Sequence, residues 1–210
     1  TTPPAAGWTT LVSETFEGAF PGSWTLYDNY SDGYTWGKRN CMKYAGSYAG
    51  WGTGGGASGS SLACGDNYAD DADAWMVAGP FSLADATAAE TRLMYSLNSE
   101  VDYDYLCWYA SVDGENFYGT CHSGDSAGWT EGVLDFSDIY TLGDLLGEPQ
   151  VWVGIRFVSD ISNNYYPGVV VDNIVVRKCS GGTCPAVQAV GGAPDTLHQV
   201  VGQATLAVSQ

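Results

Sequence analysis

The sequence has few basic side chains. Seven Lys and Arg residues stand against 24 Asp and Glu residues, so the formal net charge is -17 at pH 7. Such a chain repels the phosphates of nucleic acids and of anionic membrane surfaces, so we expect neither as a partner; it favours cations instead. No apolar run approaches the roughly 18 residues that a membrane span needs, which argues against membrane insertion.

Histidine is scarce as well. His122 and His198 lie in different regions, and the chain contains neither a His-Glu-x-x-His motif nor a nucleophile-elbow motif. The alternating acids Glu100, Asp102 and Asp104 resemble the paired carboxylates of jelly-roll glycanases. The further acid that completes the glycanase signature is absent, so we interpret these residues as an acidic loop that enters a strand. We therefore predict that the protein is not an enzyme, and we expect His122 to lie at the surface.

The six cysteines include no Cys-x-x-Cys pair, which argues against a zinc ribbon. An even number of cysteines among Gly, Tyr and Ser residues favours three disulfides, and hence an extracellular or cell-surface protein. The N-terminal residues 1–6 are neither basic nor apolar, so we expect any signal peptide to have been removed. The sequence does not choose rigorously among the possible pairings of six cysteines. We expect the sequential one, in which one bond each closes a Gly-rich stretch, a hairpin and a short loop: Cys41–Cys64, Cys107–Cys121 and Cys179–Cys184.

The remaining composition indicates β structure. Twenty-eight Gly, 14 Tyr and 8 Trp residues leave little material for solvent-exposed helices. Alternating or continuous apolar runs predict strands at 8–17, 23–27, 74–81, 91–99, 103–111, 117–121, 128–136, 151–159 and 168–177. We expect a long loop or meandering hairpin at 46–65, and at most one helical turn at 142–146. This pattern predicts one all-β domain, a two-sheet β-sandwich of the jelly-roll type.

One of these strands carries an acid at its centre. Residues 168–177 are rich in Val and Ile and are bounded by turn residues on both sides, which is typical of a core strand. Asp172 lies in the middle, where a carboxylate costs several kcal/mol unless it is paired, hydrogen-bonded or bound to a cation. Two interpretations remain open: Asp172 binds a metal cation, or it lies at a strand edge and accepts hydrogen bonds from turn amides.

The loop at 28–36 is acidic and rich in turn residues. Asp28 and Asp32 can supply oxygen ligands to a metal, or they can form ordinary turns in which Asp bonds to nearby backbone groups. The loop lacks the full Asp-x-Asp-x-Asp-Gly pattern and the closing Glu of an EF-hand, so that family is excluded. The densest acidic run, at 66–73, is typical of a solvated loop.

Short motifs follow one another along residues 9–178. In order, they are Phe16-Glu17, Gly22-Ser23-Trp24, residues 28–36, residues 73–80, residues 109–114, Gly128-Trp129, residues 155–159 and residues 171–176. Each motif is weak singly, but their order resembles that of the MAM-like and cleaved-adhesin jelly-roll domains, which include the choice-of-anchor type. Those domains occur on bacterial secreted proteases, adhesins and surface proteins.

In that family a calcium ion, Ca2+, bridges the first and last strands. The resemblance implies ligation by Glu17, at the end of the first strand, and by Asp172, in the last strand, with Asp73 as a neighbour. Backbone carbonyls would complete the usual shell of roughly six to eight oxygens. Many members have two acids in the last strand, whereas here Asn173 takes the second place, which implies a weaker site or a differently shared ligand set.

The C-terminal segment alternates apolar and polar residues after a linker rich in Ala, Val and Gly. One face of the expected strand carries Val200, Ala204, Leu206 and Val208. A strand with one apolar face must dock on an exposed sheet edge, of its own chain or of a neighbouring copy, unless it belongs to a domain linker. We divide the chain into a jelly-roll domain at 1–180, a linker at 181–196 and a terminal strand at 197–210.

Together these features predict a non-catalytic extracellular module, stabilised by Ca2+, that acts in adhesion or surface assembly. Its partners would be further copies of itself, joined into a filament by exchange of the terminal strand, or other surface proteins. The alternative is a carbohydrate- or protein-binding module attached to a secreted protease or hydrolase, whose exposed aromatic side chains stack on sugars or contact peptides. Tyr165-Tyr166 and Tyr30/Tyr34 are candidates for such a face.

Overall fold

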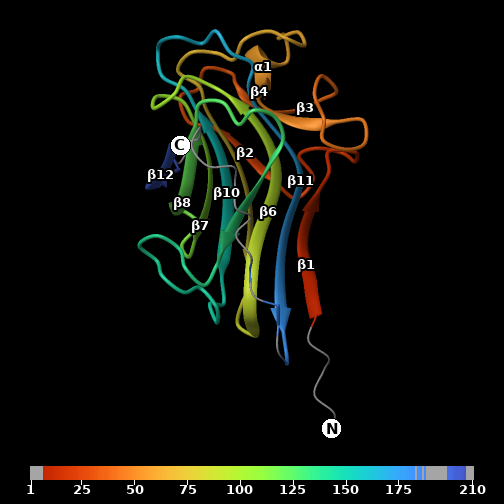
Figure 1. The fold of residues 1–210 in the computed structure, drawn as a ribbon, viewed down its shortest axis with the longest axis vertical. Coiled ribbons are helices and arrows are strands. Elements are labelled where there is room, and N and C mark those ends of the chain that lie inside the picture. The colour runs from red at the N-terminus through yellow and green to blue at the C-terminus, as the bar shows by residue number, and fades with distance from the viewer. Residues whose placement is uncertain (1–6, 183, 186, 188–197, 207–210) are drawn as a thin grey trace.

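The computed structural model describes residues 7–182, 184, 185, 187 and 198–206 (Figure 1). In this part of the chain the single helix is α1, Gly56–Gly59, and none is long and apolar enough to cross a membrane. The strands are β1 (Gly7–Glu14), β2 (Thr25–Asp28), β3 (Thr35–Arg39), β4 (Ala49–Gly55), β5 (Asp73–Phe81), β6 (Ala86–Asn98), β7 (Tyr105–Ser111), β8 (Asn116–Ser123), β9 (Thr130–Asp135), β10 (Val151–Val158), β11 (Gly168–Ser180) and β12 (His198–Thr205).

The strands form two antiparallel sheets packed face to face (Figure 1). Sheet A has the order β3-β4-β11-β6-β9, and sheet B has the order β12-β8-β7-β10-β5-β2. Within sheet A, β6 pairs with one edge of β11, whereas β4 and then β1 share the other edge. This arrangement confirms the predicted all-β sandwich of the jelly-roll type, with β11 as the central strand of sheet A.

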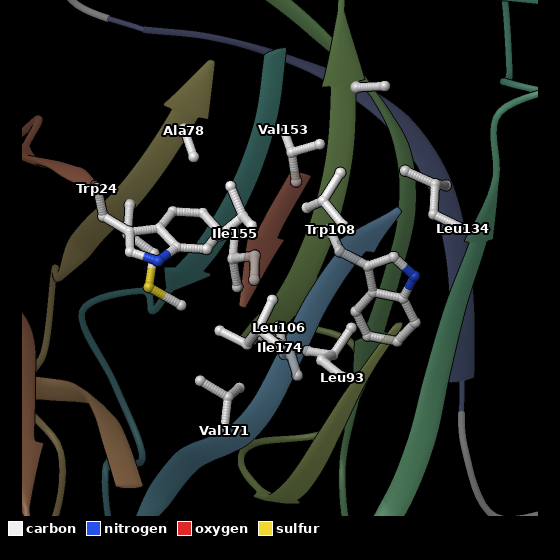
Figure 2. Packing of buried hydrophobic residues seen from close by; sticks show 14 of the residues in the cluster. Trp24, Ala78, Leu93, Leu106, Trp108, Leu134, Val153, Ile155, Val171 and Ile174 are labelled. Carbon is white, nitrogen blue, oxygen red and sulfur yellow. The ribbon is translucent and has the colours of Figure 1, made fainter. Parts of the chain in front are cut away.

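The hydrophobic core lies between the two sheets. Figure 2 shows Val171 and Ile174 of β11 in this space, together with Leu106 of β7 and Ile155 of β10. All four side chains are at most 1% exposed. Each buried Val, Leu or Ile contributes roughly 1.5–3 kcal/mol to stability, so this interior is the main source of the folding free energy.

A β-bulge at Asp172 and Asn173 keeps both polar side chains out of the core. The register of β11 against β6 shifts between Asp172 and Val175, and Asn173 has a φ of 49°, in the left-handed region that Asn tolerates. The extra residue moves the inward-facing series by one position. That series is Val169, Val171, Ile174 and Val176.

Of the two expectations for residues 46–65, the long loop is wrong, because the segment contains β4 and α1. β4 pairs antiparallel with β3 and is thus one arm of a hairpin. In β4, Gly50 and Gly52 alternate with larger residues and face inward: a Cβ on Gly50 would lie 2.4 Å from the Phe16 ring, and one on Gly52 would lie 2.7 Å from Val169. The glycines thus allow close packing of the strand on the core. The structure also has β3 where a loop was expected, and no helix at 142–146.

The three predicted disulfides are confirmed. The bonds join Cys41 to Cys64, Cys107 to Cys121 and Cys179 to Cys184. The second bond links directly opposite residues of β7 and β8.

The prediction that His122 lies at the surface is wrong. Its ring is half-buried and stacks on Trp108, with ring centroids 4.7 Å apart and an interplanar angle of 13°. Its Nδ1 is buried and has no hydrogen-bond partner among the described residues. Burial lowers the pKa of His122 from its usual 6.5 to about 4.

We expect this histidine to make the protein acid-sensitive. Between pH 6.5 and pH 4 the unfolded chain binds a proton at His122 that the folded chain does not, so the free energy of unfolding falls as the pH falls through this window. The loss is about 3 kcal/mol. Urea unfolding at several pH values should show this slope in the wild type and in a His198→Asn control, and a reduced slope in His122→Phe. An unchanged slope in His122→Phe would contradict the expectation.

Candidate functional site

Two hollows adjoin on the outer face of sheet A. Their volumes are about 280 Å³ and about 290 Å³. Residues of the loop before β4, of β11 and of the segment before β11 line both of them: Met42, Val170 and Pro167. Polar side chains also line the hollows, namely Arg39 and Asp66 in the first and Ser96, Asn98 and Asp125 in the second. Because the hollows share three residues, they form one groove across β4, β11 and β6, called the groove below.

The floor of the groove is apolar and firmly held. Trp51 of β4 and Val170 of β11 belong to a small hydrophobic cluster separate from the main core. The indole Nε1 of Trp51 donates a 2.9 Å hydrogen bond to the carbonyl of Pro167, which ties the floor to the shared rim. Arg39 lies over the Trp51 ring and donates hydrogen bonds to backbone carbonyls of the segment 54–62.

Aromatic side chains stand at the rim. Tyr44 is 50% exposed and meets Trp129 edge to face, with ring centroids 5.6 Å apart. Trp129 packs against the cluster of Trp51 and Val170 that forms the floor, and Tyr44 belongs to the same loop as Met42, which lines both hollows. The pair therefore flanks the groove with π-faces that a ligand can contact.

The loop at 40–48, called the wall loop, is held to sheet A by Asp172. One carboxylate oxygen, Oδ2, accepts hydrogen bonds from the amides of Tyr44 and Ala45, both at 3.0 Å. The other oxygen, Oδ1, accepts the amide of Asn173 at 2.7 Å. Asp172 is fully buried, in the interior of sheet A rather than at an edge, where β11 changes its neighbour from β4 to β1. In the structure its charge is thus balanced by backbone N–H groups, as in the second interpretation from the sequence.

Glu17 holds the other end of the wall loop. It lies beyond the end of β1, and its Oε1 accepts hydrogen bonds from the amides of Ser47 and Tyr48, at 2.7 Å and 2.9 Å. These bonds lower the pKa of Glu17, with help from Lys38 and Lys43. Gly46 permits this approach: its φ is +63°, and a Cβ there would lie 2.4 Å from Oε1.

Asp73 does not join Glu17 and Asp172. It points outward from sheet B, where Arg156 binds its carboxylate with two bonds of 2.6 Å and 2.9 Å. Asn29 donates a third bond. The core separates this ion pair from the outer face of sheet A, so the resemblance placed Asp73 wrongly beside the other two acids.

Asp28 and Asp32 form turn hydrogen bonds, as in the second interpretation of their loop. Asp28 accepts the amides of Asp32 and Gly33, and Asp32 accepts the amide of Tyr34. Burial, reinforced by the Asp28 carboxylate, raises the pKa of Asp32 to about 6. The five predicted metal ligands therefore do not converge on one site. Glu17 and Asp172 hold the wall loop, whereas Asp28 and Asp32 lie with Asp73 near the paired strands β2 and β5 of sheet B.

A different set of acids gathers at one end of the sandwich. In the described part of the chain, one group of three carboxylates has its oxygens within 4.8 Å of one another: Glu100, Asp104 and Asp160. Asp104 is fully buried, accepts hydrogen bonds from the Tyr68 hydroxyl and the Asp160 amide, and has a pKa raised by burial. Oxygen Oε2 of Glu100 is buried without a hydrogen-bond partner among the described residues.

The terminal strand docks on its own chain. All eight residues of β12 pair with β8, which extends sheet B by one strand (Figure 1). Ala204 and Leu206 are buried in a second hydrophobic cluster, on the outer face of sheet B, with Trp75 and Phe117. The side chain of Val200 and the whole of Val208 lie outside the described residues, as does most of the predicted linker.

Sequence reasoning missed most of the groove. It predicted a loop or meandering hairpin at 46–65 and therefore overlooked Trp51, although the alternation of Gly50 and Gly52 with larger residues indicates a strand with one closely packed face. Of the proposed aromatic residues, Tyr165 is 76% exposed and lies two residues from Pro167, whereas Tyr166 packs on the core. Tyr30 is 54% exposed, and Tyr34 is half-buried.

We expect Asp172→Asn to destabilise the fold. Three backbone amides donate hydrogen bonds to this buried carboxylate, and the substitution removes its charge and one of its two acceptor oxygens. The free energy of unfolding should therefore fall by about 2–4 kcal/mol. Urea unfolding measures the loss. Asp138→Asn, at an exposed residue, serves as the control, and a loss no larger than that of the control would show that the Asp172 charge contributes nothing.

No family model and no curated protein matches the chain. Among solved structures, the K2 cleaved adhesin domain of Lys-gingipain (Kgp) is similar, with a TM-score of 0.53 at 17% identity, over 79% of this chain and 96% of that one. The K1 cleaved adhesin domain of the Porphyromonas gingivalis W83 enzyme has a TM-score of 0.49 at 16% identity, with the same coverage of 79% and 96%.

A carbohydrate-binding module is a more distant match. The CBM22-1 xylan-binding domain of Paenibacillus barcinonensis Xyn10C has a TM-score of 0.45 at 10% identity, over 83% of this chain and 97% of that one. At 17% identity the comparison with the K2 domain establishes a shared fold only. The chain is thus a β-sandwich similar in fold to the K2 cleaved adhesin domain.

Proposed function

We propose that the protein is a non-catalytic, extracellular adhesion module whose ligand occupies the groove. The observation that carries this proposal is the groove itself: two hollows meet on the face of sheet A, and a disulfide and two carboxylates hold the loop that walls them. A preformed recess with an apolar floor and a few polar groups is the usual form of a ligand site. The three disulfides support an extracellular location.

The acidic cluster supports the non-catalytic part of the proposal. General acid–base work requires a carboxyl group that reaches the substrate. Asp104 is fully buried, and both of its oxygens already accept hydrogen bonds from Tyr68 and Asp160. Because Asp104 is fully buried, its carboxylate is not accessible to a substrate in this structure.

Adhesion tests this function. Beads coated with the protein should adhere to some of a set of glycan-coated and matrix-protein-coated surfaces, and the double variant Tyr44→Ala/Trp129→Ala should lose that adhesion because it removes the rim of the groove. Tyr140→Ala is the control, since Tyr140 is 53% exposed and does not line the groove. Adhesion that survives the double variant, or that is absent on every surface, would refute the proposal.

Stabilisation by Ca2+ is a further part of the proposed function. Glu17 and Asp172 fit this ion poorly, because the groups nearest their oxygens are amide N–H donors, which a cation repels. What supports the proposal is the net charge of -17 together with the cluster at Glu100, where three carboxylates converge and a buried oxygen lacks a partner. A bound cation would relieve the repulsion among these three carboxylates.

Surface assembly is the second candidate function. The observation that favours it is the docking of β12: eight residues pair with the edge strand β8, and Ala204 and Leu206 complete an apolar cluster. A neighbouring copy could donate the same strand to the same edge, which would join copies into dimers or filaments. Because β12 pairs with β8 of its own chain, the fold does not require strand exchange between copies.

One experiment tests calcium and assembly through two measurements. If Ca2+ is present at about 100 times its Kd, the melting temperature should exceed that in chelator by roughly 5–10 °C. Glu100→Gln should remove the difference and Glu17→Gln should keep it.

Sedimentation tests the assembly. Strand exchange between copies predicts a mass that rises with protein concentration, and a monomer once residues 186–210 are deleted. A melting temperature indifferent to chelator rejects the ion, and a full chain that is monomeric at every concentration rejects the assembly.

A further inference from the structure

We infer that the ligand of the groove is a neutral polysaccharide chain, an assignment that rests on the proposed binding function and specifies its ligand class. Four features of the groove carry it: the pairing of the floor strands, the side chains that line the hollows, the charges among them, and the continuity of the two hollows.

The floor cannot bind a peptide through its backbone. β4 lies between β3 and β11, β6 lies between β11 and β9, and β11 is paired along both of its edges. An extended peptide that joins a sheet needs a free edge with unpaired N–H and C=O groups. The ligand must therefore be recognised by side chains that project from the face of the sheet.

Those side chains combine apolar surfaces with hydrogen-bonding groups. Met42, Trp51 and Val170 supply the apolar floor and wall, and Ser96 and Asn98 stand in the second hollow. A pyranose ring has one face of C–H groups and hydroxyls around its perimeter, so it can lie on the apolar surface while its hydroxyls reach the polar groups. The Tyr44–Trp129 pair adds aromatic faces at the rim.

The charges of the groove disfavour an anionic ligand. Each hollow carries a carboxylate, Asp66 in the first and Asp125 in the second, and each accepts a backbone hydrogen bond through one oxygen. The second oxygen can accept a bond from a sugar hydroxyl. Arg39 is the one cation among the lining residues described, and three of its hydrogen bonds go to backbone carbonyls. Lys43, on the wall loop, lies near Glu17.

The continuity of the groove indicates a chain rather than a single sugar. The hollows meet at Met42, Pro167 and Val170, so successive units of one linear molecule can fill both. Tyr165, 76% exposed and two residues from Pro167, stands close to this junction in sequence and offers a further aromatic contact. Binding should therefore strengthen with the number of sugar units until both hollows are occupied.

Calorimetric titration of the full chain with defined glycans tests the inference. The probes are neutral oligosaccharides of increasing length from xylan, mannan and β-glucan, with oligogalacturonate and heparin fragments as anionic counterparts. We expect at least one neutral series to bind, with affinity rising with length, and the anionic probes not to bind. Tyr44→Ala and Trp129→Ala should each weaken binding on the order of tenfold, whereas Tyr140→Ala should not change it. Melting curves confirm that each variant is folded.

The outcomes separate the ligand class from the function. Neutral glycans that bind equally well to Tyr44→Ala and Trp129→Ala would place the site elsewhere and overturn the inference. Anionic glycans that bind while neutral ones do not would overturn the ligand class. If no glycan binds but the coated beads adhere to protein surfaces in a groove-dependent way, the inference fails and the adhesion function stands.

Discussion

The carboxylate of Asp172 lies where the edge of β11 passes from β4 to β1, and sheet A depends on it. Where β11 changes its neighbour, the regular ladder of inter-strand hydrogen bonds is interrupted. Nearby backbone amides then need an acceptor that no neighbouring strand supplies. Asp172 accepts three of them, from Tyr44, Ala45 and Asn173. The same bonds fasten the wall loop to the face of the sheet, so one side chain connects the central strand with the loop that walls the groove.

Anionic side chains in this protein are mostly balanced without basic partners. Glu17 accepts two backbone amides, Asp28 and Asp32 close turns, and Asp104 accepts a hydroxyl and an amide. Asp73 is an exception, since Arg156 binds it with two hydrogen bonds. With 24 acids and seven bases, backbone N–H groups are the abundant source of positive potential, and the structure uses them where the sequence suggested a metal.

Much of the fold could be predicted because its signals are local. The alternation in β6, β8 and β10 follows from side chains that point to opposite faces of a strand, and the three disulfides join cysteines at most 23 residues apart. The groove could not be predicted in the same way. Among its shared residues, Met42 lies more than 100 positions from Pro167 and Val170, and no motif marks them. They meet because β4 pairs with β11.

The sequence by itself determined the fold class and the strand-rich composition, and it predicted, without deciding, the sequential disulfide pairing and an acid within a core strand. These properties follow from periodicity, composition and short separations along the chain. Only the tertiary structure decided what that acid binds and where a ligand can sit, because both depend on which loop crosses the face of sheet A. That crossing is set by pairings between residues more than 100 positions apart, such as Trp51 with Val170 and Tyr44 with Asp172.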